Sequence, residues 1–223
     1  LGTVTDTQDV TGNAISHNEV NITTETLIDA LKKFEGETEQ IPPMYSAIKS
    51  NGKRLYELAR KGETVEREPR KIEIHSIELI ERLNDTDFVL DIVCSKGTYI
   101  RTLCHDIGEY LGCGGCMASL RRTAVGSFSV DKAVKIADIQ KAADNGKLES
   151  LIIPVDTLFS DCQRINLTAK ETEKIKNGNP IKNANNLSSG KVRLYSDAGE
   201  FLAYAEAFPD EIKIIKSFYE VNL

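Results

Sequence analysis

The sequence predicts an α+β fold: a mixed, mostly antiparallel sheet with flanking helices, followed by a small C-terminal β-rich domain. Alternating apolar residues predict strands over 72–79 and 88–94, which form an antiparallel pair. Apolar residues with helical spacing predict helices over 24–34 and 101–111. Beyond residue 161, one capped helix and several short strands within about 60 residues predict a compact β-rich domain that is shaped like a small barrel.

Turn and cap residues predict the remaining elements. The tandem Pro42-Pro43 excludes a helix at that point, and a slip in the alternation near Ser76 predicts a β-bulge. Further expected features are a Thr- and Asp-rich turn over 3–13, a short helix over 53–61, a polar turn over 84–87, a strand over 118–130, a helix over 133–143, a domain boundary at 160–166, a helix opened by the capping box of Thr168 and Glu171, a hairpin over 192–205 and a last strand over 212–218.

Composition sets broad limits on the function. The chain has 223 residues, of which 40% are hydrophobic and 28% are charged, as is typical of a globular protein. No apolar run approaches the length of a membrane span. The five cysteines form no regular framework, which argues against a disulfide-stapled secreted protein and favours the cytoplasm. The net charge of −6 weakly disfavours nucleic acid as a partner for the chain as a whole.

One segment has the opposite charge. Residues 49–71 carry eight basic and four acidic side chains, a local net charge of +4. The segment is rich in turn residues and has aromatic rings at Tyr45, just before it, and at Tyr56. It is either a solvated helix face with i,i+4 ion pairs or a surface arm that contacts an anionic partner.

The most informative stretch is the junction that follows strand 88–94. A polar turn places Tyr99 and Arg101 where the strand meets the next helix. An aromatic face stacks a base and a guanidinium holds an anion, so the pair predicts a nucleotide site. Arg101 also opposes the helix dipole in the first turn, which favours a functional reason for its place. The alternative is a surface ion pair with Asp106 or Glu109 beside a core tyrosine.

Two further motifs have alternative interpretations. Leu120-Arg121-Arg122 would set two guanidiniums on opposite faces of a strand, or form an ordinary charged edge strand. Cys113 and Cys116 have the spacing of a zinc or redox half-site, but no second CxxC pair exists and two glycines between thiols also suit a tight turn.

These motifs together resemble the bacterial TruB family of tRNA pseudouridine synthases over nearly the whole chain. The matching stretches are Leu1-Gly2 with 5–7 and Asp9, the run 40–49 with 52–57, the block 94–102, the run 108–112, Leu120-Arg121-Arg122, and 176–180. The resemblance implies a pseudouridine synthase fold, present in part. It also implies an isomerase that converts a uridine in the T loop of tRNA to pseudouridine, with neither a metal nor an organic cofactor.

The resemblance assigns half of a catalytic site. Arg101 matches the arginine that pairs with the family's catalytic Asp, keeping that carboxylate ionised and oriented. Tyr99 and Leu120 match residues of the uracil pocket. The family's Asp lies in a Gly-x-Leu-Asp motif upstream of the matched region, and these 223 residues do not contain that motif. We therefore expect the chain to be the C-terminal part of the enzyme and to be inactive alone.

The resemblance also implies an RNA partner, the T stem-loop of tRNA, for a monomeric protein. Residues 1–161 correspond to the C-terminal portion of the catalytic domain, residues 40–67 within it to an RNA-binding insertion, and residues 162–223 to a PUA-like RNA-binding domain. The expected RNA-binding residues are Lys49, Lys53, Arg54, Tyr56, Arg60, Lys96 and Arg122. The target base has to leave its stack to be reached. The alternatives are a non-catalytic RNA-binding module and a thiol or zinc protein built on Cys113 and Cys116.

Overall fold

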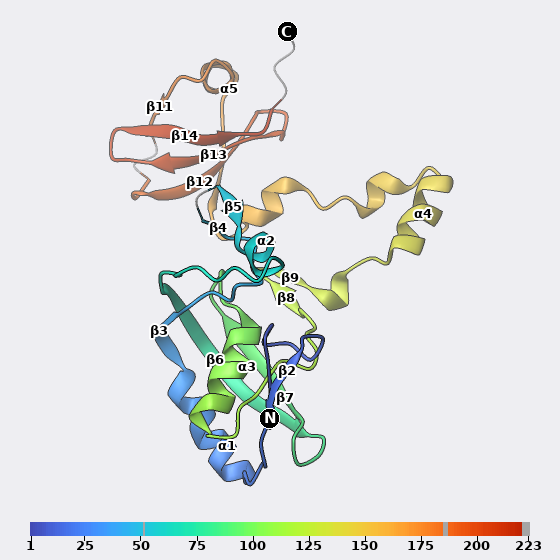
Figure 1. The fold of residues 1–223 in the computed structure, drawn as a ribbon. Helices are drawn as coiled ribbons and strands as arrows, with labels where there is room; N and C mark the ends of the chain where they lie inside the picture. The colour runs from blue at the N-terminus through green and yellow to red at the C-terminus, as the bar shows by residue number, and fades with distance from the viewer. Residues whose placement is uncertain (51, 185–186, 220–223) are drawn as a thin grey trace. The chain divides into compact units, whose positions relative to one another are not determined.

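The computed structural model describes residues 1–50, 52–184 and 187–219. Asn51, in the expected insertion, and 220–223, in the expected C-terminal domain, lie outside the described residues. The chain divides into two compact units, Leu1–Arg121 and Arg122–Leu223 (Figure 1). This division falls about 40 residues before the expected boundary at 161/162, which stays a prediction. No helix of the described residues is long and apolar enough to cross a membrane.

The first unit consists of short strands and helices around one antiparallel sheet. In chain order it contains β1 (Thr3–Thr5), β2 (Ala14–His17), α1 (Thr24–Leu31), a 3₁₀ turn (Lys32–Phe34), β3 (Gly36–Gln40), β4 (Lys49–Ser50), β5 (Lys53–Arg54), α2 (Leu55–Ala59), β6 (Arg70–Arg82), β7 (Phe88–Cys94) and α3 (Ile100–Tyr110). The main sheet has the order β3-β6-β7 (Figure 1). The predicted β6–β7 pair is confirmed, as is the bulge near Ser76, because the register shifts between Ile74 and Ser76.

Apolar side chains join α1 and α3 to this sheet. Their common cluster consists of Leu27, Leu31, Ile72, Ile74, Ile77, Leu103 and Ile107. Alternate residues of β7 add to this core, whereas Val89 and Val93 on the other face are exposed. The cluster therefore fixes the position of α3, and with it the junction that β7 and α3 form.

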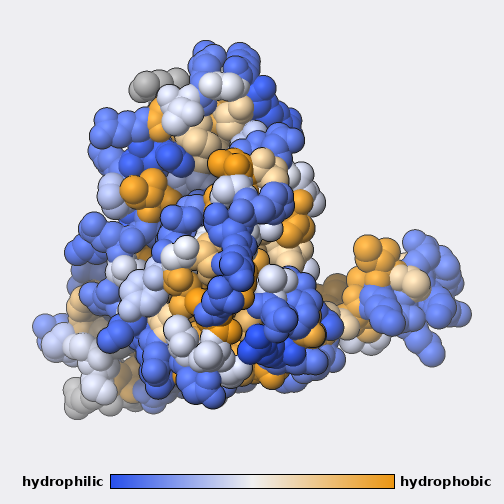
Figure 2. All heavy atoms as spheres, turned by 60° about the horizontal axis from the view of Figure 1, so that its bottom comes forward, coloured by the Kyte–Doolittle hydropathy of each residue, from blue (hydrophilic) through white to orange (hydrophobic). Residues whose placement is uncertain are grey.

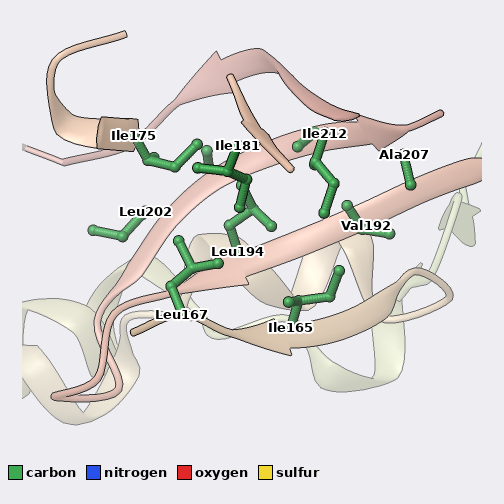
Figure 3. Packing of buried hydrophobic residues seen from close by; sticks show 11 residues of the cluster. Ile165, Leu167, Ile175, Ile181, Val192, Leu194, Leu202, Ala207 and Ile212 are labelled. Carbon is green, nitrogen blue, oxygen red and sulfur yellow. The ribbon is translucent and has the colours of Figure 1, made fainter. Parts of the chain in front are cut away.

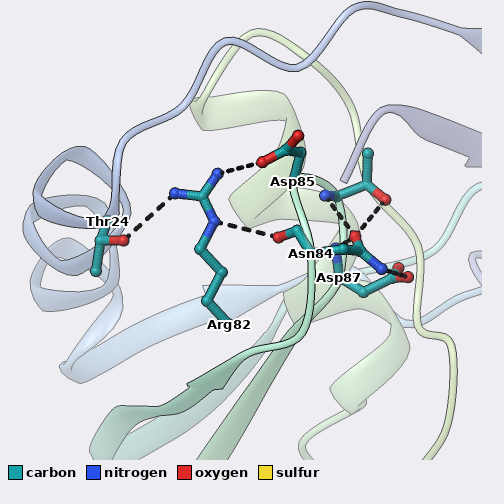
Figure 4. A network of polar contacts seen from close by, with 6 residues as sticks. Thr24, Arg82, Asn84, Asp85 and Asp87 are labelled. Carbon is teal, nitrogen blue, oxygen red and sulfur yellow. Dashed lines mark hydrogen bonds and ion pairs between the residues drawn. The ribbon is translucent and has the colours of Figure 1, made fainter.

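A polar network closes the β6–β7 hairpin and ties it to α1. The Arg82 guanidinium donates to the Asn84 carbonyl at 3.2 Å and to Asp85 Oδ1 at 2.9 Å. On its other side it reaches Thr24 Oγ1 at 3.5 Å (Figure 4). Asn84 also binds the side chain of Asp87 at 2.8 Å, so the predicted polar turn holds itself together.

One prediction of secondary structure is wrong, and one strand was missed. The expected strand 118–130 is only the short hairpin of β8 (Ala124–Val125) and β9 (Phe128–Ser129), because Gly126 turns the chain with φ 55°. Residues 118–123 are neither helix nor strand. Conversely, β3 was not expected, since Gly36-Glu-Thr-Glu-Gln carries no apolar alternation; it pairs with β6 through its backbone.

The second unit contains the remaining elements. They are β8, β9, three 3₁₀ turns (Val130–Lys132, Leu148–Leu151, Val155–Phe159), α4 (Ile136–Asp144), β10 (Gln163–Asn166), α5 (Ala169–Lys176), β11 (Ile181–Lys182), β12 (Gly190–Tyr195), β13 (Phe201–Ala207) and β14 (Glu211–Ser217). The sheet has the order β10-β12-β13-β14-β11, with only β10 and β12 parallel. The predicted capping box is confirmed, because Thr168 N–H donates to Glu171 Oε2 at 2.9 Å and Glu171 N–H donates back to Thr168 Oγ1 at 3.4 Å.

Two groups of side chains pack against this sheet. Eleven buried residues form one core between α5 and the sheet, among them Ile175 of α5 and Leu194 and Leu202 of the strands (Figure 3). An aromatic group also holds the preceding segment to the sheet, because Phe159 stacks on Tyr204 with ring centroids 4.5 Å apart. The Tyr195 hydroxyl donates to Asp156 in the same segment. These contacts attach residues 155–162 to the second unit.

Apolar side chains stay exposed elsewhere in the second unit. Ile136 on α4 is 85% exposed, and Ile152 and Ile153 are also exposed. Figure 2 shows apolar residues as separate areas within a largely hydrophilic face. On α4, Ile139 is also exposed, at 39%.

Candidate active site and nucleic-acid interface

The junction between β7 and α3, residues 95–101, is here named the corner. Its turn needs glycine at position 97, where φ is 90°. The turn is anchored on the sheet, because Glu73 N–H donates to Ser95 Oγ at 2.9 Å, and Thr98 Oγ1 donates to the Ser95 carbonyl at 3.0 Å. Tyr99 then caps α3 with extended backbone angles. The hydrogen bonds of the corner therefore fix the backbone that carries Tyr99 and Arg101.

Arg101 lies half-buried in the first turn of α3. Its Nη2 donates to the Tyr45 carbonyl at 2.8 Å, across a separation of 56 residues. The alternative of a surface ion pair is wrong, because neither Asp106 nor Glu109 forms a salt bridge with Arg101 in the described part of the chain. A guanidinium has five N–H donors, so most remain to hold an anion.

Tyr99 is held by a residue that the sequence analysis missed. Gln40, at the end of β3, accepts the Tyr99 N–H at 2.8 Å and donates its Nε2 to the Tyr99 carbonyl at 3.2 Å. Gln40 is 4% exposed. Gln40 begins the run 40–49 that resembles the family, but nothing in the sequence distinguishes its amide from the exposed polar residues before it.

The Thr- and Asp-rich turn at the start of the chain packs beside α3. Thr102 donates to Gln8 Oε1 at 2.7 Å, and Gln8 has φ 61°, an uncommon conformation for a residue other than glycine. The carboxylates in this turn serve the turn itself. Asp6 accepts from Asn13, and Asp9 accepts from the backbone and the side chain of Thr11.

Residues 40–67 are here named the arm. The β4–β5 hairpin pairs Lys49 with Arg54, and α2 follows directly. The guanidiniums of Arg54 and Arg60 lie over the Tyr56 ring, at 5.8 Å and 5.4 Å from its centroid. The structure thus gathers Lys49, Lys53, Arg54, Tyr56 and Arg60 on one short segment.

The charged side chains of the arm are not paired with one another in the described residues. Among the described residues of 49–71 no ion pair forms, so the alternative of a salt-bridged helix face is wrong. The lysines and arginines at 49, 53, 54 and 60 are exposed, whereas Leu55 and Leu58 are buried and anchor the arm. A cavity of about 280 Å³ lies between the β4–β5 region of the arm and residues 66–70. Ile48, Leu55, Arg67 and Arg70 help to line it.

The other three predicted site residues are exposed. Lys96 is exposed in the turn of the corner itself. Leu120 is 58% exposed in a segment without regular structure, so its expected place on a strand is wrong. Arg122 shares that correction and begins the second unit. The uracil contact of Leu120 and the RNA contact of Arg122 stay predictions.

Packing accounts for the spacing of Cys113 and Cys116. A Cβ on Gly108 of α3 would lie 2.2 Å from the Gly115 nitrogen, and one on Gly114 would lie 2.4 Å from Val4. Gly108 and Gly115 therefore let the turn pack directly against α3, and Gly114 lets it pack against Val4. Cys113 is buried with its Sγ 3.5 Å from the Gly114 carbonyl oxygen. In the described residues no group of three or more His, Cys, Asp or Glu side chains could hold a metal ion.

Comparison with known proteins identifies the family. The model of the TruB family pseudouridylate synthase N-terminal domain matches residues 1–100. The tRNA pseudouridylate synthase B C-terminal domain matches 101–160, and the C-terminal model of pseudouridine synthase II TruB matches 164–213.

Curated relatives agree with this match. The tRNA pseudouridine synthase B of Actinobacillus pleuropneumoniae is 42% identical over 95% of this chain and 70% of its own length. The synthase of that name from Haemophilus influenzae is 44% identical over 91% of this chain and 66% of its own length. The chain thus spans about two thirds of the length of these relatives.

Solved structures share the fold. The crystal structure of a Cbf5-Nop10-Gar1 complex aligns with a TM-score of 0.67 at 22% identity, over 91% of this chain and 64% of that chain. An H/ACA RNP bound to a substrate RNA containing 2′-deoxyuridine aligns with a TM-score of 0.65 at 18% identity. These likenesses confirm the predicted α+β fold. With the family matches over almost all of its length, the chain belongs to the TruB family of pseudouridylate synthases.

Proposed function

We propose that this protein acts in the conversion of a T-loop uridine of tRNA to pseudouridine, an isomerisation. The observation that carries the proposal is Arg101, which is half-buried at the corner and has no carboxylate partner among the described residues. A guanidinium held in this way is suited to keep an incoming carboxylate ionised, since a nearby positive charge lowers the pKa of an acid. In this proposal that acid is the Asp of the family's Gly-x-Leu-Asp motif.

The residues of the corner then have distinct roles. Arg101 orients the catalytic Asp, while the Tyr99 ring and the Leu120 side chain line the pocket for the extruded uracil. The reaction detaches the base from its ribose and rejoins it through carbon, and needs no cofactor. Because these 223 residues lack the motif, we propose that the chain alone binds RNA weakly and does not turn over.

In this proposal the arm binds the RNA. Lys49, Lys53, Arg54 and Arg60 contact the phosphates of the T stem-loop, and the Tyr56 ring, framed by two guanidiniums, contacts a base or sugar. Lys96 and Arg122 add phosphate contacts. Residues 1–161 form the catalytic part and residues 162–223 a PUA-like RNA-binding domain, in a cytoplasmic monomer. The local charge of +4 over 49–71 supports this assignment.

Tritium release from tRNA that is labelled at carbon 5 of uridine tests the function. We define the extended chain as these 223 residues preceded by the Gly-x-Leu-Asp segment of a curated relative. We expect release from the extended chain and none above background from the 223 residues alone. Release by the 223 residues alone would contradict the carboxylate assignment. An extended chain that binds tRNA without releasing tritium would favour the non-catalytic RNA-binding module.

Replacement of Arg101 in the extended chain tests its role. Arg101→Ala should abolish turnover and change the Kd for tRNA less than about two-fold, because the guanidinium acts on the Asp. Arg101→Lys keeps a charge but loses the planar fork, and should lower kcat by about 10- to 100-fold. Single-turnover kinetics and filter binding measure the two quantities. A parallel loss of tRNA binding in Arg101→Ala would show that Arg101 grips phosphate instead.

A further inference from the structure

The contact between Gln40 and Tyr99 has no part in the roles given above. We propose that Gln40 is a positioning residue. It fixes the start of α3, and with it Tyr99 and Arg101, relative to the arm. The proposal rests on the proposed function for what that place is used for. It concerns a side chain that touches neither the base nor the catalytic carboxylate.

The contact is unusual because one side chain holds both backbone groups of one residue. Gln40 Oε1 accepts the Tyr99 N–H at 2.8 Å, and its Nε2 donates to the Tyr99 carbonyl at 3.2 Å. Tyr99 is the N-cap of α3, and its carbonyl also accepts the first helical hydrogen bond, from Leu103 N–H at 3.0 Å. Gln40 therefore fixes the residue at which α3 begins, two positions before Arg101.

A second contact joins the same two segments. Arg101 Nη2 donates to the Tyr45 carbonyl at 2.8 Å. Gln40 and Tyr45 delimit a six-residue stretch that contains the buried Pro42 and Pro43, whose φ angles are restricted by their rings. We name residues 40–45 the arm root. The arm root thus holds the corner at two points, one at Tyr99 and one at Arg101.

Hydrogen bonds also join the arm root and the residue after it to the rest of the arm, at Arg67 and at the start of α2. The Pro42 carbonyl accepts a hydrogen bond from Nη1 of Arg67, the last residue of the arm, at 3.0 Å. Ser46, the next residue after the root, accepts from Tyr56 N–H at 3.1 Å at the start of α2. An RNA that is held by Tyr56 is therefore connected to Arg101 through the Tyr56–Ser46 backbone hydrogen bond, the Tyr45–Ser46 peptide and the hydrogen bond from the Arg101 side chain to the Tyr45 carbonyl.

Burial makes the Gln40 contact specific to a carboxamide. The side chain is 4% exposed, so water does not replace a lost partner. Leucine has a similar volume but offers neither a donor nor an acceptor. Glutamate has the same shape and accepts the Tyr99 N–H, but when ionised it cannot donate to the Tyr99 carbonyl. Glu39, the exposed neighbour of Gln40 on β3, offers a matched control in Glu39→Gln.

The first test measures hydrogen exchange at the Tyr99 amide in the 223-residue chain. Gln40→Leu should accelerate this exchange at least about ten-fold relative to amides of β6 and β7, and Glu39→Gln should leave it unchanged. This readout needs no catalysis, so it decides the contact whether or not the proposed function holds. Wild-type protection of the Tyr99 amide in Gln40→Leu would overturn the proposal.

The second test separates positioning from folding in the extended chain. Gln40→Leu should lower kcat by about 10- to 100-fold, while the Kd for tRNA changes less than two-fold. In Gln40→Glu, kcat should be low at pH 8 and rise towards pH 6, because burial favours the protonated carboxyl, which regains the donor. Neither the wild type nor Glu39→Gln should show that rise.

The outcomes are distinguishable. Wild-type kcat in Gln40→Leu, an equal loss of tRNA binding and kcat, or a flat pH profile in Gln40→Glu would each overturn the positioning role. A wild-type extended chain without turnover would instead contradict the proposed function. The exchange measurement would still show whether Gln40 holds the Tyr99 backbone.

Discussion

Arg101 and Gln40 differ in how visible they are in the sequence. Arg101 could be selected because a cation in the first turn of a helix is unfavourable, and the structure shows it at the corner, bonded to Tyr45. Gln40 could not be selected, because its importance comes from a partner 59 residues away. Neighbours in the sequence do not reveal that it alone of its strand is buried.

Cys104 lies on α3 about one turn after Arg101, where burial raises the pKa of its thiol to about 11. Burial also raises the pKa of the nearby Cys116 thiol. A raised pKa leaves little thiolate at neutral pH, and the thiolate is the form that attacks disulfides and binds metals. These two thiols are therefore poorly suited to the redox or zinc function that the spacing of Cys113 and Cys116 left open.

The raised pKa of Cys104 makes stability depend on pH in a defined window. The unfolded thiol ionises near its ordinary pKa of 9.0, whereas the folded one holds its proton to about 11. The unfolded state therefore binds fewer protons between these values, and stability falls as pH rises through the window. The fall should be about 3 kcal/mol for two pKa units. Urea unfolding from pH 8.5 to 11 should show a steeper loss in the wild type than in Cys104→Ser; parallel curves would contradict it.

At the scale of elements, apolar alternation was a reliable guide and polar strands were not. The strands β6 and β7 and their bulge were predictable because one face of each is buried. β3 was not, since its residues up to Gln40 are exposed and it is held by backbone pairing with β6. The strand predicted over 118–130 was too long, because the charged and small residues of this run show neither the periodicity of a strand nor that of a helix.

The contact between α3 and the Gly114–Gly115 turn should be intolerant of any side chain. In Gly108→Ala the new Cβ would lie 2.2 Å from the Gly115 nitrogen and 2.3 Å from the Gly114 carbonyl carbon, so backbone has to move. We expect a loss of about 3 kcal/mol in the free energy of unfolding, although alanine favours the helix. The exposed neighbour Glu109→Ala is the control and should change it by less than about 0.5 kcal/mol. Chemical denaturation measures both; equal midpoints would show that the turn is not packed as described.

At the scale of the whole molecule, net charge was a poor guide to the partner. The chain carries −6 overall, while residues 49–71 carry +4. Binding to phosphates needs one basic surface rather than a basic protein. The local excess was visible in the sequence. The absence of ion pairs among the described residues of this segment was not, because it depends on how the hairpin and α2 orient their side chains.

The arm should account for much of the salt dependence of RNA binding. The double variant Lys53→Gln with Arg60→Gln removes two exposed cations and should reduce the slope of log K against log salt by roughly one to two. The control is Lys32→Gln with Lys33→Gln, which removes two exposed cations near α1 and should leave the slope unchanged. Titrations with a T-arm stem-loop at several salt concentrations measure it. An equal effect of both doubles would mean that only the overall charge matters.

β14 comes late in the chain, yet it lies inside its sheet, between β13 and β11. Both edges of that sheet, β10 and β11, are made from earlier residues. During synthesis β11 therefore has no partner until β14 has left the ribosome. A premature stop codon before Glu211 would remove an interior strand rather than trim an edge, and the nascent domain would become a substrate for chaperones and proteases.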